Sequence, residues 1–287
     1  MSGFVRPKNR PDDGRERARR CRFLSALVLA TTACGPSADV AAPGAGEGSA
    51  ASSLPSYEMR SFESAGGECG SADQPVQCVR VALSWPEATA PAELAATVNE
   101  GIARWLRRAT FVQGGSSPEE IFEELVTAHD DLRQEFPDYA LPWHVERTVS
   151  IVRDDGQVFA LSLYENMFTG GAHGVRTQLY RNFRPDTGAA ITLEELIVEG
   201  GIEQLTAVGE EIFRTAHELA PDIALDDAGF WFDDGVFALN DNFLVSTDAL
   251  FFYYNEYEVA AYAVGPTELL IPYERIGSLL RPAAGLR

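Results

Sequence analysis

The chain has 287 residues, of which 45% are hydrophobic, and 23 Lys+Arg against 43 Asp+Glu give it a formal net charge of −20. This length and apolar content are enough for one large or two modest globular domains. A chain so acidic repels phosphate backbones, so we exclude nucleic acid as a partner. Its four cysteines are too few for a disulfide-dense miniprotein.

The first 33 residues predict an export signal. Residues 1–22 carry eight basic and three acidic side chains, and an apolar run follows from Phe23 to Ala33. A basic region, a short apolar run and then small residues are typical of a bacterial export signal. The run is shorter than the roughly 20 residues of a transmembrane helix, so a membrane-spanning anchor is the less favoured alternative. Because the basic region is long, a start downstream of Met1 stays open.

The small residues directly before Cys34 resemble a lipoprotein box, in which the cysteine is acylated and becomes the mature N-terminus. We therefore expect lipidation at Cys34 and a lipid-anchored protein of the bacterial cell envelope. Thr31 stands where such boxes usually have a large aliphatic residue, so cleavage after Ala33 and release as a soluble secreted protein is the alternative. Residues 34–56 are mainly Gly, Ala, Ser and Pro and predict a flexible tether.

Cys69 and Cys78 are the two cysteines that follow the leader. Their short spacing, with turn-forming residues between them, predicts a disulfide in an exported protein. The alternative is a metal site, for which Glu68 and Asp73 are the only further ligands nearby. We therefore expect a disulfide, no metal and no cofactor.

Apolar periodicity predicts helices and strands in separate runs. Strands are expected at 76–85, 143–152, 158–168 and 175–183, helices at 92–108, 117–137, 192–195 and 202–219, and short strands at 230–232, 236–239, 243–246 and 250–254. An Asp155-Gly156 turn and other short connections link most strands as hairpins. This arrangement favours an α+β fold, with antiparallel sheets and packed helices, over a doubly wound α/β fold.

Three segments resemble a known extracytoplasmic family. Residues 164–174 are Tyr-Glu-Asn-Met-Phe-Thr-Gly-Gly-Ala-His-Gly, and residues 182–196 contain Asn-Phe, then Asp-Thr-Gly, then Leu-Glu-Glu-Leu. Residues 252–265 are Phe-Tyr-Tyr-Asn-Glu-Tyr-Glu-Val-Ala-Ala-Tyr-Ala-Val-Gly, and Ile-Pro-Tyr follows at 271–273. These motifs are similar to those of the extracytoplasmic domain of RsiV-type anti-sigma factors, which are lysozyme receptors. The same domain occurs in bacterial lipoproteins.

The resemblance covers roughly residues 57–280 and implies two α+β subdomains. Residues 57–185 are similar to the accessory module of a PdaC-type peptidoglycan deacetylase, and residues 186–287 to the RsiV-type C-terminal domain. The sequence has neither a sigma-binding segment nor a deacetylase catalytic domain, so transcriptional regulation and deacetylation are not expected of it. Glu256 stands where the family usually has Pro.

His173 is the sharpest candidate for a binding residue, because its imidazole can donate or accept a hydrogen bond. The glycines around it would let a ligand or partner approach the backbone closely. The alternative is that His173 only orders this connection. Tyrosines, which are favoured at interfaces, are expected to add an aromatic recognition surface unless they pack in the core. The candidate binding residues are His173, Gly170, Gly171, Gly174, Tyr164, Tyr257 and Tyr262, with Tyr253 and Tyr254 as further tyrosines.

No catalytic signature is present, so no catalytic residue is assigned. The other histidines, His129, His144 and His217, are expected to be structural or solvated. Four aspartates between residues 226 and 234 are expected to lie in a solvated turn, with weak cation binding as the alternative.

These observations predict a non-catalytic binding module of the cell envelope, whose partner is lysozyme or another basic envelope protein. The chain without its leader has 15 Lys+Arg against 40 Asp+Glu, a charge suited to steering a basic partner. An envelope glycan is the second kind of partner. Two alternatives stay open: an enzyme that acts on peptidoglycan or an envelope peptide through His173 and a carboxylate, and a purely structural lipoprotein.

Overall fold

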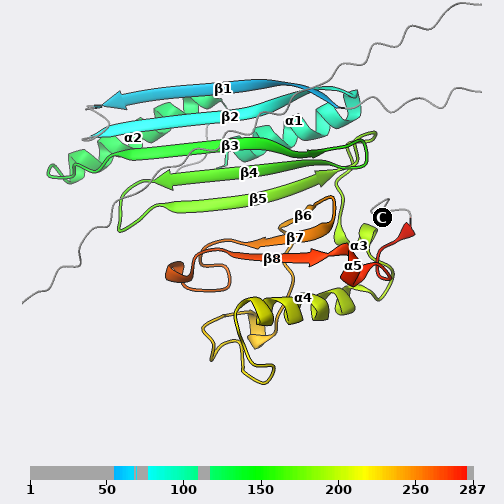
Figure 1. The fold of residues 1–287 in the computed structure, drawn as a ribbon. Helices are drawn as coiled ribbons and strands as arrows, with labels where there is room; N and C mark the ends of the chain where they lie inside the picture. The colour runs from blue at the N-terminus through cyan, green and yellow to red at the C-terminus, as the bar shows by residue number, and fades with distance from the viewer. Residues whose placement is uncertain (1–54, 68, 70–76, 109–116, 283–287) are drawn as a thin grey trace, which may run out of the picture. The chain divides into compact units, whose positions relative to one another are not determined.

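The computed structural model of the chain describes residues 55–67, 69, 77–108 and 117–282. The predicted export signal, Cys34 and the tether up to residue 54 lie outside the described residues. All described residues belong to one compact unit. This unit contains helices and two separate sheets, which confirms the expected α+β class (Figure 1).

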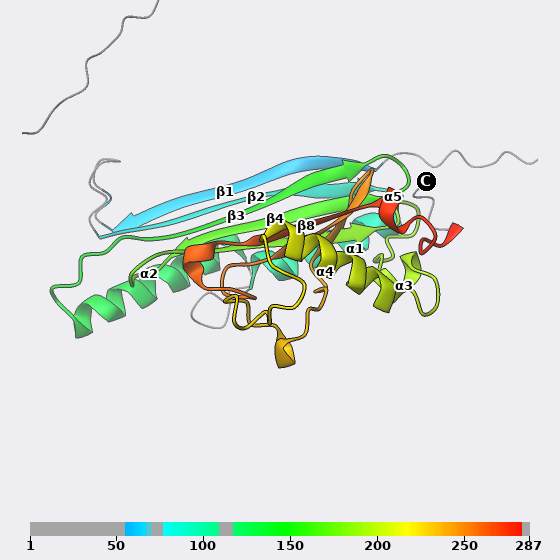
Figure 2. The same ribbon diagram turned by 60° about the horizontal axis from the view of Figure 1, so that its bottom comes forward.

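The first half of the described chain forms a five-stranded sheet and two helices. In chain order the elements are β1 (Ser56–Gly67), β2 (Cys78–Ala90), α1 (Ala92–Leu106), α2 (Pro118–Glu135), β3 (Trp143–Asp154), β4 (Phe159–Phe168) and β5 (Val175–Phe183). The strand order in the sheet is β1-β2-β3-β4-β5. Figures 1 and 2 show α1 and α2 on one face of this sheet.

One strand pair differs from the expected antiparallel arrangement. β2 pairs with β3 in parallel, whereas the β1–β2, β3–β4 and β4–β5 pairs are antiparallel. The connection between the two strands explains the parallel pairing. Both α1 and α2 lie between β2 and β3 in the chain, so the chain returns to the end of the sheet where β2 begins before it enters β3. A parallel pair needs a long crossover of this kind, while the short turn at Asp155-Gly156 gives an antiparallel hairpin.

The helices of the first half form where the apolar spacing predicts them. α1 buries Leu94, Val98, Ile102 and Trp105, which lie on one helical face. α2 begins after Ser117, whose hydroxyl accepts a hydrogen bond from the backbone N–H of Glu120 at 3.2 Å. The two helices pack their apolar faces on the sheet and build one hydrophobic core with it.

The second half of the chain forms a three-stranded antiparallel sheet with helices beside it. Its elements are α3 (Leu193–Leu196), α4 (Ile202–Ala216), η1 (Asp233–Gly235), β6 (Phe243–Val245), β7 (Ala249–Tyr254), η2 (Tyr262–Val264), β8 (Thr267–Pro272) and α5 (Tyr273–Ile276). The strand order is β6-β7-β8. A second hydrophobic core lies between this sheet, α4 and the loops before it, and it also includes Ala160 of β4 and Val158, which directly precedes β4. The predicted division of the chain at residue 185 stays a prediction.

The predicted strands at 230–232 and 236–239 are wrong. Phe230 makes only an isolated bridge to Ala260, and the segment around it has no regular strand. Its apolar pattern arises because Phe230, Phe232 and Phe237 are buried from irregular backbone, where their rings contact one another and Phe213. Core aromatic residues at short spacing therefore imitate strand periodicity.

Two strands, β1 and β8, are not among the predicted elements. β1 begins at Ser56, the last residue of the expected tether, and pairs with β2 along its whole length. It lies at the sheet edge with Tyr57 and Met59 exposed, so backbone hydrogen bonds hold it without a clear apolar pattern. In β8 the buried Leu269 and Ile271 alternate with exposed positions, but the exposed Leu270 obscures that alternation.

Candidate functional site

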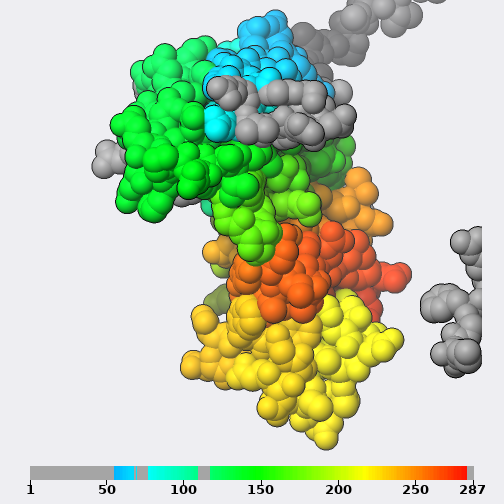
Figure 3. Space-filling model, turned by 90° about the vertical axis from the view of Figure 1, so that its left-hand side faces the viewer, coloured from blue at the N-terminus to red at the C-terminus, as the bar shows by residue number. Residues whose placement is uncertain are grey.

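Three of the predicted binding residues, His173, Tyr257 and Tyr262, form one cluster. The His173 ring stacks on Tyr262 with the ring centroids 3.8 Å apart and the planes 13° from parallel. The His173 Nε2 atom lies 3.2 Å from the Tyr257 hydroxyl, and the two tyrosine rings are 5.6 Å apart. The connection between β4 and β5 thereby meets the segment between β7 and β8, as the green and orange surfaces show (Figure 3).

The hydrogen bonds of His173 define its tautomer. Its Nδ1 atom lies 2.9 Å from the carbonyl oxygen of Gly174, which can only accept, so Nδ1 carries the proton. In the neutral imidazole Nε2 is then an acceptor, and the Tyr257 hydroxyl donates to it. Both ring nitrogens are therefore occupied, while one face of the ring lies on Tyr262.

Tyr257 is held in an uncommon backbone conformation. Its φ is +66°, a region that bulky residues rarely adopt, and its side chain is 53% exposed. The turn is fixed because the backbone N–H of Asn255 donates to the Glu258 carboxylate at 2.8 Å and the Glu258 N–H to the Asn255 carbonyl at 3.0 Å. Strain retained at an exposed aromatic residue is a feature of binding and active sites.

The three predicted glycines serve the connection in different ways. Gly170 has a φ of +100°, and a Cβ atom there would lie 2.4 Å from the Tyr139 hydroxyl, which accepts a hydrogen bond from the Trp143 indole. Gly171 has a φ of +94° with no atom near the Cβ position, and a Cβ on Gly174 would lie 2.9 Å from the Met167 carbonyl. Glycine at these three positions therefore allows the positive φ or the close contact that the backbone of this connection has.

Tyr164 lies apart from the cluster. It is a half-buried residue of β4, paired with Thr148 of β3 and Gln178 of β5, and it has no ring contact with the cluster among the described residues. Tyr254 is buried and donates to the Ala238 carbonyl, and Tyr253 is half-buried. Of the predicted tyrosines, only Tyr257 and Tyr262 are brought to His173.

Three asparagines that the sequence analysis did not single out join the two sheets. Asn255 accepts from the Gln178 N–H at 2.7 Å, and Asn242 accepts from the Tyr180 N–H at 2.8 Å. Asn182 of β5 accepts from the Val245 N–H and donates to the Phe243 carbonyl. Asn242 and Asn255 thus satisfy backbone groups at the outer edge of β5, and Asn182 satisfies backbone groups of β6.

The contacts of Asn182, Asn242 and Asn255, which we call the asparagine junction, also bring the two segments of the cluster together. Asn255 stands two residues before Tyr257, and its partner Gln178 follows His173 by five residues. A signal for the junction was present in the sequence, since Asn182 and Asn255 belong to the quoted motifs. Their partners could not be predicted, because these are backbone groups distant in the chain.

The predicted cysteine pair and the buried or packed histidines lie away from the cluster. Cys69 and Cys78 form a disulfide with their Cα atoms 4.5 Å apart. His129 is buried and 3.1 Å from the Leu141 carbonyl, and His217 packs on Phe213 and Phe230. Within the described ranges no three His, Cys, Asp or Glu side chains gather as metal ligands, and no helix there has the length and apolar character of a membrane span. Cys34 lies outside these ranges.

The fold and the cluster define an α+β domain of two sheets, with an exposed histidine–tyrosine surface built from two distant segments. Residues 194–274 match the family model described as "Protein of unknown function (DUF3298)". The match covers α4, the second sheet and both tyrosines of the cluster. A search of curated proteins found no match.

Two solved structures from this family are similar in fold. A member from Bacteroides fragilis superposes with a TM-score of 0.61 at 19% identity, covering 80% of this chain and 96% of that chain. A DUF3298 family protein from Pseudomonas aeruginosa gives a TM-score of 0.58 at 18% identity and covers 81% of this chain and 97% of its own. At these identities the likeness concerns the fold alone.

Proposed function

We propose that this protein is a non-catalytic binding module of the cell envelope whose partner is a basic protein, with lysozyme as the first candidate. The observation that carries the proposal is the stack of the exposed His173 and Tyr257 with the half-buried Tyr262. Tyrosine offers a large contact area and a polar tip at low entropic cost, which suits recognition. The net charge of −20 supports a basic partner, because opposite charge accelerates encounter.

The contacts of His173 support binding over the enzymatic alternative. The enzymatic alternative pairs His173 with a carboxylate, which would act as the second acid or base of the reaction. Here the ring nitrogens contact the Gly174 carbonyl and the Tyr257 hydroxyl, and neither partner is a carboxylate. The resemblance to RsiV-type receptors further supports lysozyme as the partner, and the PdaC-type likeness supports an envelope glycan as the second candidate.

The test is calorimetric titration of the purified protein with hen lysozyme at low ionic strength and again at about 0.15 M salt. We expect binding that weakens with salt, and Tyr262→Ala should weaken it by about tenfold or more. Tyr57→Ala is the matched control, because Tyr57 is an exposed tyrosine of β1 outside the cluster. Equal losses in the two variants would contradict the proposed surface.

A second measurement separates the enzymatic alternative from binding. The protein is incubated with peptidoglycan, and soluble products are followed by mass spectrometry. The binding module should release none. Product release that His173→Ala abolishes would overturn the proposal in favour of an enzyme.

We further propose that the module is held at the membrane by a lipid on Cys34. The supporting observations are the basic and apolar leader and the small residues before Cys34. Expressed in a bacterial host, the protein should fractionate with membranes, and Cys34→Ser should move it to the soluble exported fraction. An unchanged distribution would argue against the lipid.

A further inference from the structure

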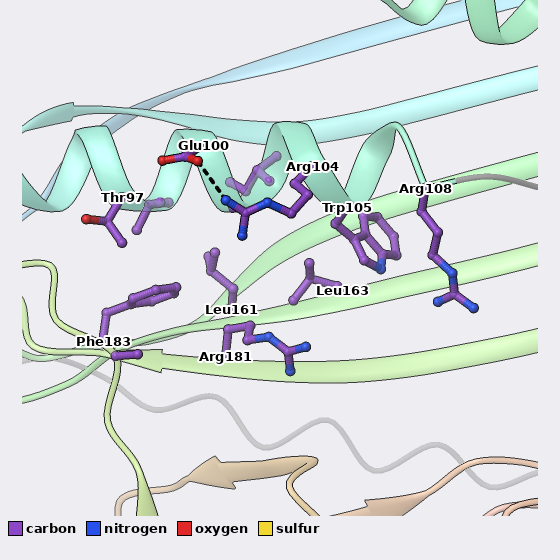
Figure 4. Close-up of a pocket in the computed structure, with 13 residues that line it drawn as sticks. Thr97, Glu100, Arg104, Trp105, Arg108, Leu161, Leu163, Arg181 and Phe183 are labelled. Atoms are coloured by element: carbon purple, nitrogen blue, oxygen red, sulfur yellow. Dashed lines mark hydrogen bonds and ion pairs between the residues drawn. The ribbon is translucent and has the colours of Figure 1, made fainter. Parts of the chain in front are cut away.

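A groove lies between α1 and strands β4 and β5 (Figure 4). None of the residues that line it belongs to the His173 cluster. Its volume is about 620 Å³, within the range of small-molecule sites. Apolar side chains from both elements line it: Val98, Ile102, Trp105, Leu161, Leu163 and Phe183. We call this the α1–β5 groove.

Trp105 brings an unpaired donor into the groove. Its side chain is 8% exposed, and its buried Nε1 atom has no hydrogen-bond partner. An indole N–H can only donate, and leaving it unpaired in the interior is costly. In Figure 4 the Trp105 indole extends from α1 toward the strands, so a small rotation of the ring would offer its N–H to an acceptor atom in the groove.

The charged residues of the groove oppose the charge of the whole chain. Arg104, Arg108 and Arg181 line it with a single acid, Glu100, although acids outnumber bases nearly twofold in the sequence. Glu100 pairs with Arg104 at 2.6 Å. Among the ion pairs of the described residues, none involves Arg108 or Arg181. Two guanidinium groups are therefore available to an anion.

The surroundings of Arg181 also favour an anion beside its guanidinium. Its guanidinium donates to the Tyr180 carbonyl at 2.6 Å. Burial lowers the pKa of Arg181, and the charge of Asp241 offsets this effect in part. An anion bound beside the guanidinium would stabilise its charged form further.

We propose that the α1–β5 groove binds a single-chain amphiphilic anion. The apolar floor of the groove complements the alkyl chain, and the two arginines without an ion pair and the Trp105 N–H complement the anionic headgroup. The alkyl chain lies on Leu161, Leu163 and Phe183, and the anionic headgroup accepts from the Trp105 Nε1 atom and from Arg108 and Arg181. A carboxylate and a phosphate headgroup share this chemistry. The groove has no residue in common with the His173 cluster, so this proposal does not depend on the proposed function.

The test is calorimetric titration of the purified protein with decyl phosphate below its micelle concentration, with decanoate as the second headgroup. We expect saturable binding of both. Inorganic phosphate carries the head without the chain, and decanol the chain without the charge, so each should bind at least about tenfold more weakly. If inorganic phosphate binds as tightly as decyl phosphate, the groove is only an anion site. If decanol binds as tightly as decyl phosphate, the groove is only an apolar site. Either result would overturn the proposal.

Variants locate the site. Arg181→Gln and Trp105→Phe should each weaken the binding of decyl phosphate by several-fold. The double variant Arg108→Gln with Arg181→Gln should weaken this binding by about tenfold or more. Arg107→Gln is the matched control, because Arg107 is an exposed neighbour of Arg108 that does not line this groove. It should stay within about twofold. Arg181 reaches solvent although its guanidinium is partly desolvated, so its substitution tests the groove even if Trp105→Phe alters folding. Loss of binding in Arg107→Gln equal to that in Arg181→Gln, or no binding at all, would overturn the proposal.

Discussion

At the residue scale, two neighbouring glycines of the connection between β4 and β5 have different surroundings. Gly170 faces the Tyr139 hydroxyl at a distance that no Cβ atom tolerates, whereas Gly171 faces open space at nearly the same φ. The sequence shows both as equivalent members of one motif. Their surroundings make them different, and substitution can measure that difference.

We expect Gly170→Ala to lower the free energy of unfolding by more than Gly171→Ala does. Both substitutions place a Cβ atom at positive φ, which costs about 1–2 kcal/mol. Only Gly170→Ala adds a clash with Tyr139, whose hydroxyl is bonded to the Trp143 indole. Urea unfolding of the two variants measures the difference. Equal losses would mean that Tyr139 moves aside freely.

A buried ion pair holds the end of α1. Arg147 and Glu165 face each other across β3 and β4, are almost wholly buried, and approach to 2.6 Å. Arg147 also donates to the carbonyls of Leu106, the last residue of α1, and of Arg108. The arginine thus satisfies orphan carbonyls of a helix end and fixes the wall of the α1–β5 groove.

Arg147→Met should destabilise the protein by about 3–5 kcal/mol, because it leaves the Glu165 carboxylate buried and unpaired. The control is Arg275→Met, which removes an exposed pair with Glu211 and should cost less than about 1 kcal/mol. Chemical denaturation gives both values. Adding Glu165→Leu to Arg147→Met should recover much of the loss, and failure to do so would contradict the unpaired charge as the cause.

At the element scale, β5 is an edge strand covered by side-chain amides rather than by another strand. An exposed strand edge invites pairing with other chains. Here Asn242 and Asn255 occupy its outward backbone groups, and Asn182 reaches across to β6. Each side-chain amide has one donor group and one acceptor group, so it can form the hydrogen bonds that the backbone of a neighbouring strand would form at one or two residues.

Asn182→Ala should cost about 1–3 kcal/mol, because it leaves the buried Val245 N–H and Phe243 carbonyl without partners. Amide hydrogen exchange at Val245 should accelerate by more than the global loss of stability explains. Asn166→Ala is the matched control, since Asn166 of β4 makes no side-chain hydrogen bond among the described residues. Val245 exchange equal in the two variants would contradict the role of Asn182.

At the scale of the whole molecule, tyrosines govern the response to alkaline pH. The chain has one lysine, Lys8, so few other groups titrate near pH 10. Burial raises the pKa of Tyr253 and of Tyr273 to about 12, and it raises the pKa of Tyr254 beyond the ordinary range. All three tyrosines belong to the second half of the chain, in β7 and α5.

We expect stability to fall as the pH rises from about 10 to 12. The unfolded chain releases these phenolic protons near pH 10 while the folded chain keeps them, so unfolding is favoured at higher pH and unaffected by these groups below pH 10. Urea unfolding between pH 8 and 11.5 measures the slope. Tyr273→Phe should make the slope shallower by about one proton. An unchanged slope would exclude Tyr273 as a contributor.

The sequence alone predicts the local structure where side-chain burial is periodic. It locates α1, α2 and the strands from β3 to β5 closely, because their apolar residues recur with the period of one buried face. It misses β1, which backbone pairing holds at an exposed edge, and it assigns strands to core phenylalanines on irregular backbone. For the candidate site it supplies His173, Tyr257 and Tyr262 as residues but no geometry.

By itself, then, the amino-acid sequence determines the acidic charge, the cysteine pair and most of the helices and strands, since each depends on composition or on neighbours in the chain. The tertiary structure alone decides the parallel pairing of β2 with β3, the meeting of His173 with Tyr257 and Tyr262, and the arginine-lined groove at Trp105. The physical reason is distance along the chain. His173 and Tyr257 are 84 residues apart, and only the packed sheets and their asparagine junction bring them within hydrogen-bonding reach.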